Sequence, residues 1–171
     1  MKRKFEILAT IISLLIGGVV YARTPDFVSG YSGYKWGTDV SKQPGFVKVS
    51  NSTPFQFQNT IVYKHTGDDT IVLNGRRIIR AEEILYVVIN GKLEVVYTVI
   101  SRSNPKMVQD FYFLKSSLED YYGKPSEVTA TGREVFYNHG GASLKLSMGK
   151  YTKMIIYAPG YKNRAKTYQF R

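Results

Sequence analysis

The chain has 171 residues, of which 43% are hydrophobic and 22% are charged, a composition typical of a folded domain. It has 24 Lys and Arg against 13 Asp and Glu, which gives a formal net charge of +11. Because the chain contains no Cys, disulfide frameworks, thiol nucleophiles, Cys-zinc sites and iron–sulfur clusters are excluded.

The amino terminus has the pattern of a secretory signal peptide. Three basic residues follow Met1, and the stretch from Ile7 to Val20 has no charged residue. Val20 and Ala22 are the small residues that a cleavage site after Ala22 requires. This apolar stretch is shorter than the roughly 20 residues that a membrane-spanning helix needs. We therefore expect residues 1–22 to be a signal peptide and the rest of the chain to be periplasmic or extracellular.

The remaining chain divides into three expected parts. Residues 23–37, rich in Gly and aromatic residues, predict an extended lead-in that attaches to the domain through its rings. Residues 38–159 predict a single α+β domain. Residues 160–171 carry four basic residues and no acidic one, which predicts a loose basic tail. The four attaching rings of the lead-in are Phe27, Tyr31, Tyr34 and Trp36.

The first half of the domain predicts a short helix and then strands. Thr38 is expected to cap a helix near residue 40 that Pro44-Gly45 ends. The β-branched runs 61–65 and 70–74 flank four polar residues and predict a hairpin. Strands over 84–89 and 93–100 are joined through Asn90-Gly91, a dipeptide typical of type I′ turns. Both strands are almost continuously apolar, so we expect cover on both faces of their sheet.

The second half predicts the main helix and a three-stranded meander. Apolar residues recur at helical spacing over about 105–122, and Gly123 and Pro125 follow the last of them. Strands are expected over 135–138, 143–148 and 153–157. We therefore predict an α+β fold in which one amphipathic helix packs on an antiparallel sheet. The apolar face of the helix is expected to contain Met107, Phe111, Leu114, Leu118 and Tyr121.

Three short motifs between residues 36 and 125 resemble a class of small exported bacterial α+β domains. They are Trp36-Gly37 before a short helix, the turn Asn90-Gly91-Lys92-Leu93, and an amphipathic helix that ends in Tyr122-Gly123-Lys124-Pro125. The resemblance implies an envelope or secreted location and a helix packed on an antiparallel sheet. It implies no active site.

Only two residues are candidates for a base at neutral pH. His65 and His139 both lie at the ends of predicted hairpins, where polar side chains are common. No Gly-x-Ser-x-Gly nucleophile turn, calcium loop or phosphate-binding glycine loop occurs. We therefore assign no catalytic residue, metal site or cofactor. A hydrolase that uses His65 or His139 with distant partners stays the alternative.

The positive charge is concentrated at the carboxyl end, where residues 131–171 contain eight basic residues and one acidic residue. We expect an exposed basic and aromatic surface that attracts an anionic partner. Export favours an envelope protein, an anionic lipid head group or an acidic glycan over nucleic acid. The leading hypothesis is a non-enzymatic binding or accessory protein of the bacterial cell envelope. The expected surface contains Lys145, Tyr151, Lys153, Tyr157, Lys162, Arg164 and Lys166.

Overall fold

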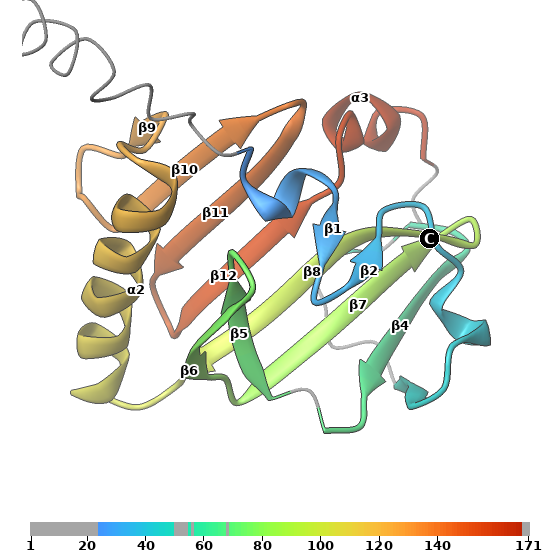
Figure 1. Cartoon of the computed structure of the whole chain (residues 1–171), viewed down its shortest axis with the longest axis horizontal. Coiled ribbons are helices and arrows are strands. Elements are labelled where there is room, and N and C mark those ends of the chain that lie inside the picture. The colour runs from blue at the N-terminus through green and yellow to red at the C-terminus, as the bar shows by residue number, and fades with distance from the viewer. Residues whose placement is uncertain (1–23, 50–54, 56, 68, 169–171) are drawn as a thin grey trace, which may run out of the picture.

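The computed structural model describes residues 24–49, 55, 57–67 and 69–168, so the predicted signal peptide lies outside the described residues. The fold is mainly β, and eight strands form one antiparallel sheet in the order β3-β4-β7-β8-β12-β11-β10-β9 (Figure 1). The predicted meander is confirmed as β10, β11 and β12. The strands of this sheet are β3 (Phe46–Val49), β4 (Thr60–His65), β7 (Glu83–Ile89), β8 (Lys92–Ser101), β9 (Glu127–Val128), β10 (Glu134–His139), β11 (Ala142–Met148) and β12 (Thr152–Tyr157).

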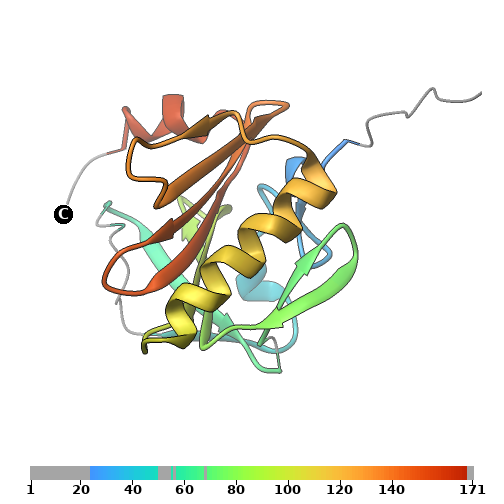
Figure 2. The ribbon, with the colours of Figure 1, turned by 90° about the vertical axis from the view of Figure 1, so that its left-hand side faces the viewer.

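The predicted main helix is confirmed as α2 (Lys106–Tyr122), which crosses one face of the sheet (Figure 2). Phe111, Leu114 and Leu118 are fully buried and belong to the cluster that contains the inward side chains of β8, β11 and β12. The helix therefore packs on the antiparallel sheet as predicted. Asp110, which the apolar pattern assigns to the outer side, is 8% exposed.

Two small hairpins cover the same face of the sheet beside α2 (Figure 1). The predicted lead-in forms a 3-10 turn, η1 (Asp26–Val28), and the hairpin of β1 (Gly30–Tyr31) and β2 (Tyr34–Lys35). Its aromatic side chains do join the core, and the Trp36 ring nitrogen donates a hydrogen bond to the Phe27 carbonyl oxygen at 2.9 Å. The lead-in is thus part of the domain and is more regular than an extended segment.

The second small hairpin corrects the predicted pairing of runs 61–65 and 70–74. β4 pairs with β3 and β7, whereas β5 (Thr70–Leu73) pairs with β6 (Arg76–Arg80). The turn between β5 and β6 is Asn74-Gly75, with φ of 53° and 76°. These positive angles are those of a type I′ turn. The dipeptide Asn74-Gly75 was therefore the decisive local signal.

The predicted helix near residue 40 is a single 3-10 turn, η2 (Val40–Lys42), capped by Asp39 and not by Thr38. The Asp39 carboxylate accepts a hydrogen bond from the Ser41 backbone N–H at 3.1 Å. Gln43 is extended, the conformation that a following proline favours. The segment therefore ends after one turn.

The face of the sheet opposite α2 is covered by aromatic residues. Phe55 and Phe57 pack with Tyr161 on outward side chains of β7 and β8, such as Val87 and Val95. Both faces of these central strands are consequently buried, as their continuous apolar sequence predicts.

The carboxyl end is also part of the fold, contrary to the predicted loose tail. Residues Tyr161–Ala165 form α3, and Tyr161 is 7% exposed. Glu94, 3% exposed, lies at a β-bulge of β8 and forms an ion pair with Arg164. A carboxylate this deeply buried needs a cationic partner, and Arg164 of the carboxyl-terminal segment supplies it.

Candidate anion-binding surface

Four residues of the predicted surface come from β11, β12 and the connection between them. Lys145 lies on β11, Lys153 and Tyr157 lie on β12, and Tyr151 lies between the two strands. Lys145 is paired with Ile155, whose side chain belongs to the cluster opposite α2. Because side chains alternate along a strand, Lys145, Lys153 and Tyr157 share this face. The structure therefore brings these predicted residues onto one surface.

The charge of Lys145 is largely compensated inside this surface. Its Nζ lies 2.6 Å from Oε1 of Glu134 and 5.1 Å from the ring centroid of Phe136. Only 25% of the Lys145 side chain is exposed. The ammonium group is thus held in place by a carboxylate and a ring, and it is a weak source of net positive potential.

Tyr151 lies near two cations, Lys153 of β12 and Arg102 directly after the end of β8. Its ring centroid is 5.7 Å from Nζ of Lys153 and 6.0 Å from Cζ of Arg102, at distances typical of cation–π contacts. The Tyr151 hydroxyl is 3.0 Å from the hydroxyl of Tyr97, which is buried. Burial and this hydrogen bond raise the pKa of Tyr97. The hydrogen bond to the buried Tyr97 hydroxyl therefore holds the Tyr151 ring in place, and the two cations lie beside this ring.

Arg102 is positioned by two carboxylates. Its Nη1 donates to Oε2 of Glu82 at 2.7 Å, and its Nη2 donates to Oε2 of Glu83 at 3.1 Å. Burial alone lowers the pKa of Arg102, but these two hydrogen bonds outweigh it and raise the pKa. The guanidinium group is therefore rigidly placed beside Tyr151, and its charge is balanced locally.

A surface hollow of about 230 Å³ lies beside Tyr151. Lys150 and Lys153 line it, and neither forms an ion pair with any described residue. Ser147 also lines it; the residue is 3% exposed, and its hydroxyl has no hydrogen-bond partner in the described part of the chain. The Glu134 carboxylate, which pairs with Lys145, lines the hollow as well. We call this arrangement the Tyr151 centre, which consists of Arg102, Ser147, Lys150, Tyr151 and Lys153.

The other predicted surface residues lie at α3. The Tyr157 ring stacks on the Tyr161 ring with centroids 5.1 Å apart, and burial raises the pKa of Tyr157. Arg164 donates through Nε to Oε1 of Glu94 at 3.0 Å, so its charge is compensated. Lys162 and Lys166 are exposed. Of the seven predicted residues, the structure gathers Tyr151 and Lys153 at the centre and gives Tyr157 and Arg164 contacts that hold α3.

The sequence prediction did not include Arg102, Ser147 and Lys150. Arg102 reaches the centre because the end of β8 pairs with the start of β12, through Ser101 and Thr152. No local pattern indicates that pairing. Lys150 follows Gly149 in the turn, and its proximity to Tyr151 and Lys153 was a usable signal.

The structure places neither histidine beside a catalytic partner from the described part of the chain. The His65 ring packs on Phe46 and Tyr34, with centroids 5.0 and 5.9 Å away. His139 is exposed in a hollow of about 410 Å³ that Lys162 also lines. Within the described residues, neither imidazole forms a hydrogen bond or an ion pair. No observation therefore favours the hydrolase alternative.

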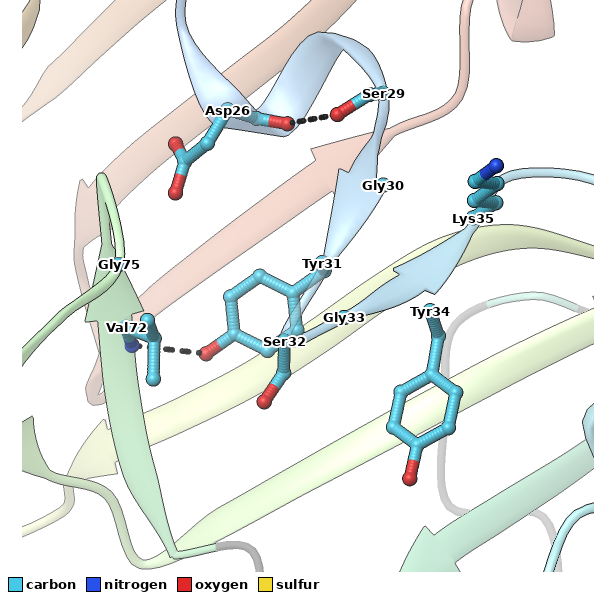
Figure 3. A pocket seen from close by; sticks show the side chains of 10 residues that line it. All are labelled: Asp26, Ser29, Gly30, Tyr31, Ser32, Gly33, Tyr34, Lys35, Val72 and Gly75. Carbon is cyan, nitrogen blue, oxygen red and sulfur yellow. Dashed lines mark hydrogen bonds between the residues drawn. The ribbon is translucent and has the colours of Figure 1, made fainter.

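The hollow of about 420 Å³ between the hairpins β1–β2 and β5–β6 is shown in Figure 3. Its carboxylate, Asp26, accepts hydrogen bonds from the Tyr122 hydroxyl at 2.5 Å and from the Asn74 backbone N–H at 2.6 Å. Burial and Asp26 raise the pKa of Tyr122. The Tyr31 hydroxyl accepts from the Val72 backbone N–H at 3.4 Å. These polar groups hold the two hairpins and η1 together, so this hollow is the weaker candidate.

Comparison of the chain with protein-family models, with curated proteins and with solved structures finds no match. Among the residues that the structure describes, no three His, Asp or Glu side chains gather as metal ligands. No described helix is both long and apolar enough to cross a membrane. The Tyr151 centre therefore has to be interpreted from its own chemistry.

Proposed function

We propose that the chain is an exported, non-enzymatic binding protein of the bacterial cell envelope, and that the Tyr151 centre binds an acidic glycan. The observation that carries this proposal is the pair Lys150 and Lys153. Neither lysine forms an ion pair with a described residue, and both line a hollow beside the buried, unpartnered hydroxyl of Ser147. A carboxylate or sulfate group on a sugar offers the negative charge that these two ammonium groups would pair with.

The charge distribution supports an anionic partner at longer range. Residues 131–171 carry a net charge of +7, from eight basic residues and one acidic residue. Lys162 and Lys166 add exposed charge at α3. A field of one sign raises the encounter rate with a polyanion. The Tyr151 centre then supplies the fixed contacts.

The chemistry of the surface favours a glycan over a lipid head group. Proteins that bind a lipid surface commonly insert apolar side chains into the head-group region. Among the described residues, the exposed large hydrophobic side chains belong to positions 47, 108, 112, 113 and 128, and none belongs to the Tyr151 centre. A hydrophilic polymer fits such a surface better.

Replacing Lys150 and Lys153 together by Gln is expected to weaken retention on immobilised polygalacturonate about tenfold. The reason is that each lysine would form one ion pair with a glycan carboxylate, and two such pairs contribute about 1.4 kcal/mol in sum. Retention of the unaltered protein should fall as salt shortens the Debye length from about 10 Å at 0.1 M to about 3 Å at 1 M. Affinity chromatography over a salt gradient measures both effects.

The matched control replaces Lys162 and Lys166 by Gln, which removes the same charge outside the Tyr151 centre. We expect a much smaller loss of retention from this control. An equal loss in both variants contradicts a defined site and leaves only net charge. Retention on anionic liposomes but not on polygalacturonate contradicts the choice of a glycan.

A further inference from the structure

Both Asn-Gly dipeptides of the chain form tight hairpin turns. Asn74-Gly75 joins β5 to β6, and Asn90-Gly91 joins β7 to β8. The four residues have positive φ, between 51° and 76°, as a type I′ turn requires. Because glycine has no Cβ to shield its backbone nitrogen, an asparagine that precedes glycine is prone to deamidation, the spontaneous loss of its side-chain amide.

Deamidation at such a dipeptide needs only base and water. The glycine backbone nitrogen gives its proton to the base and attacks Cγ of the asparagine, and the side-chain nitrogen takes up a proton and leaves as ammonia. Water then opens the resulting succinimide ring and leaves aspartate or isoaspartate, without oxidation or reduction. In a type I′ turn the glycine nitrogen first has to rotate towards the side chain. The rate in a folded protein therefore depends on how easily the turn opens.

The turn at Asn90 is firmly held. β7 and β8 lie inside the eight-stranded sheet, and nearly all of their residues are buried. The Asn90 side chain accepts a hydrogen bond from Nδ2 of Asn59 at 3.2 Å, and the Asn90 backbone N–H donates to the Asn59 carbonyl oxygen at 3.3 Å. Opening this turn therefore disrupts both the contact with Asn59 and the central strands.

The turn at Asn74 is held by fewer contacts. Ile71 and Leu73 anchor β5 in the core, but β5 and β6 form a separate two-stranded sheet beside α2 (Figure 2). A two-stranded hairpin is only marginally stable by itself. The Asn74 backbone N–H donates to Oδ2 of Asp26 at 2.6 Å, whereas its side-chain amide forms no hydrogen bond with a described residue. Gly75 is exposed, so water reaches the turn.

We infer that Asn74 is a site of spontaneous modification in the folded protein, where deamidation converts its side-chain amide to a carboxylate. The product loosens the β5–β6 hairpin from η1. The new carboxylate arises beside that of Asp26, to which the Tyr122 hydroxyl also donates, and two like charges at this distance repel each other. Isoaspartate in addition lengthens the backbone by one carbon atom, which disturbs the register that the two-residue turn sets.

The flanking residues make the two turns a matched pair for the test. The sequences are Leu73-Asn74-Gly75-Arg76 and Ile89-Asn90-Gly91-Lys92, so both sites should react at nearly equal rates in an unfolded chain. In the folded protein, kept in mildly alkaline buffer, we expect deamidation at Asn74 to be about tenfold or more faster than at Asn90. Peptide mapping by mass spectrometry measures both rates, and the same measurement in denaturing urea is the control.

Equal rates at the two sites of the folded protein overturn the proposal, because global unfolding alone then exposes both turns. No reaction at Asn74 while the chain in urea reacts overturns it as well. The structural consequence is tested separately with Asn74→Asp, which reproduces one product and should lower the melting temperature by a few degrees. Asn90→Asp is the matched control, since an aspartate there still accepts from Asn59. If both variants melt like the original protein, the carboxylate does not loosen the hairpin.

Discussion

Replacing Arg164 by Met is expected to lower the free energy of unfolding by about 3 kcal/mol, because it leaves a buried carboxylate without its cation. Glu94 is 3% exposed, and it also accepts a hydrogen bond from the Tyr168 hydroxyl at 3.2 Å. For a domain of this size the melting temperature should fall by about 10 °C. Thermal unfolding followed by circular dichroism measures the change.

Two further variants separate the ion pair from the general charge of the carboxyl end. Lys162→Met removes an exposed charge from the same helix and should change stability by no more than about 0.5 kcal/mol. Adding Glu94→Gln to Arg164→Met removes the stranded carboxylate and should restore part of the lost stability. If Arg164→Met melts like the original protein, the carboxyl end is the loose tail that the sequence predicts.

Raising the pH above 10 is expected to unfold the protein cooperatively. Burial raises the pKa of Tyr97, Tyr137 and Tyr161 above the ordinary value of 10.0, and these residues are 3%, 3% and 7% exposed. Above pH 10 their phenols ionise in the unfolded state but stay protonated in the folded state. The unfolded state then binds fewer protons, so stability falls as pH rises.

The free energy of unfolding should fall by about 1.4 kcal/mol per pH unit for each buried phenol, or by about 4 kcal/mol per pH unit for the three together. A typical total stability of 5–15 kcal/mol is therefore largely lost by about pH 12. Tyrosinate absorbance and circular dichroism should change together. Ionisation of all phenols near pH 10 while the circular dichroism stays native would contradict this expectation.

A single substitution adjusts this alkaline transition. The Tyr137 hydroxyl is buried and has no hydrogen-bond partner among the described residues, so Tyr137→Phe removes a titrating group without breaking a contact. We expect the alkaline midpoint to rise and the stability at neutral pH to be kept or increased. Tyr112→Phe is the matched control, because Tyr112 is 58% exposed and its replacement leaves the buried phenols in place.

Local patterns in the sequence predicted the main helix and the longer strands, but they did not predict β1, β2, β9 and α3 or several of the strand pairings. The helix over 105–122 was predictable because apolar spacing, a following glycine and a following proline agree. The pairing of β5 was mispredicted because polar residues 66–69 resembled a hairpin turn, whereas Asn74-Gly75 forms the turn that closes it. Turn chemistry with positive φ outweighed general polarity.

The candidate site was only partly predictable for a related reason. Tyr151 and Lys153 are close in sequence, so strand alternation and composition were enough to select them. Arg102 lies about fifty residues earlier and reaches Tyr151 only through the pairing of β8 with β12. Arg164 was assigned to the surface because nothing in the sequence shows that Glu94 is buried at a β-bulge. Long-range pairing and buried charge are set by tertiary structure.

The most direct test of the proposed function is an amide NMR titration of the protein with galacturonic acid oligomers, with neutral maltose oligomers as the control. We predict that the acidic oligomers shift the amide signals of residues 147–153 and Arg102, that the neutral oligomers shift none of them, and that the changes vanish when Lys150 and Lys153 are replaced by Gln. Shifts confined to the hollow of Figure 3, or to the turn at His139 and Lys162, would contradict the assignment of the Tyr151 centre.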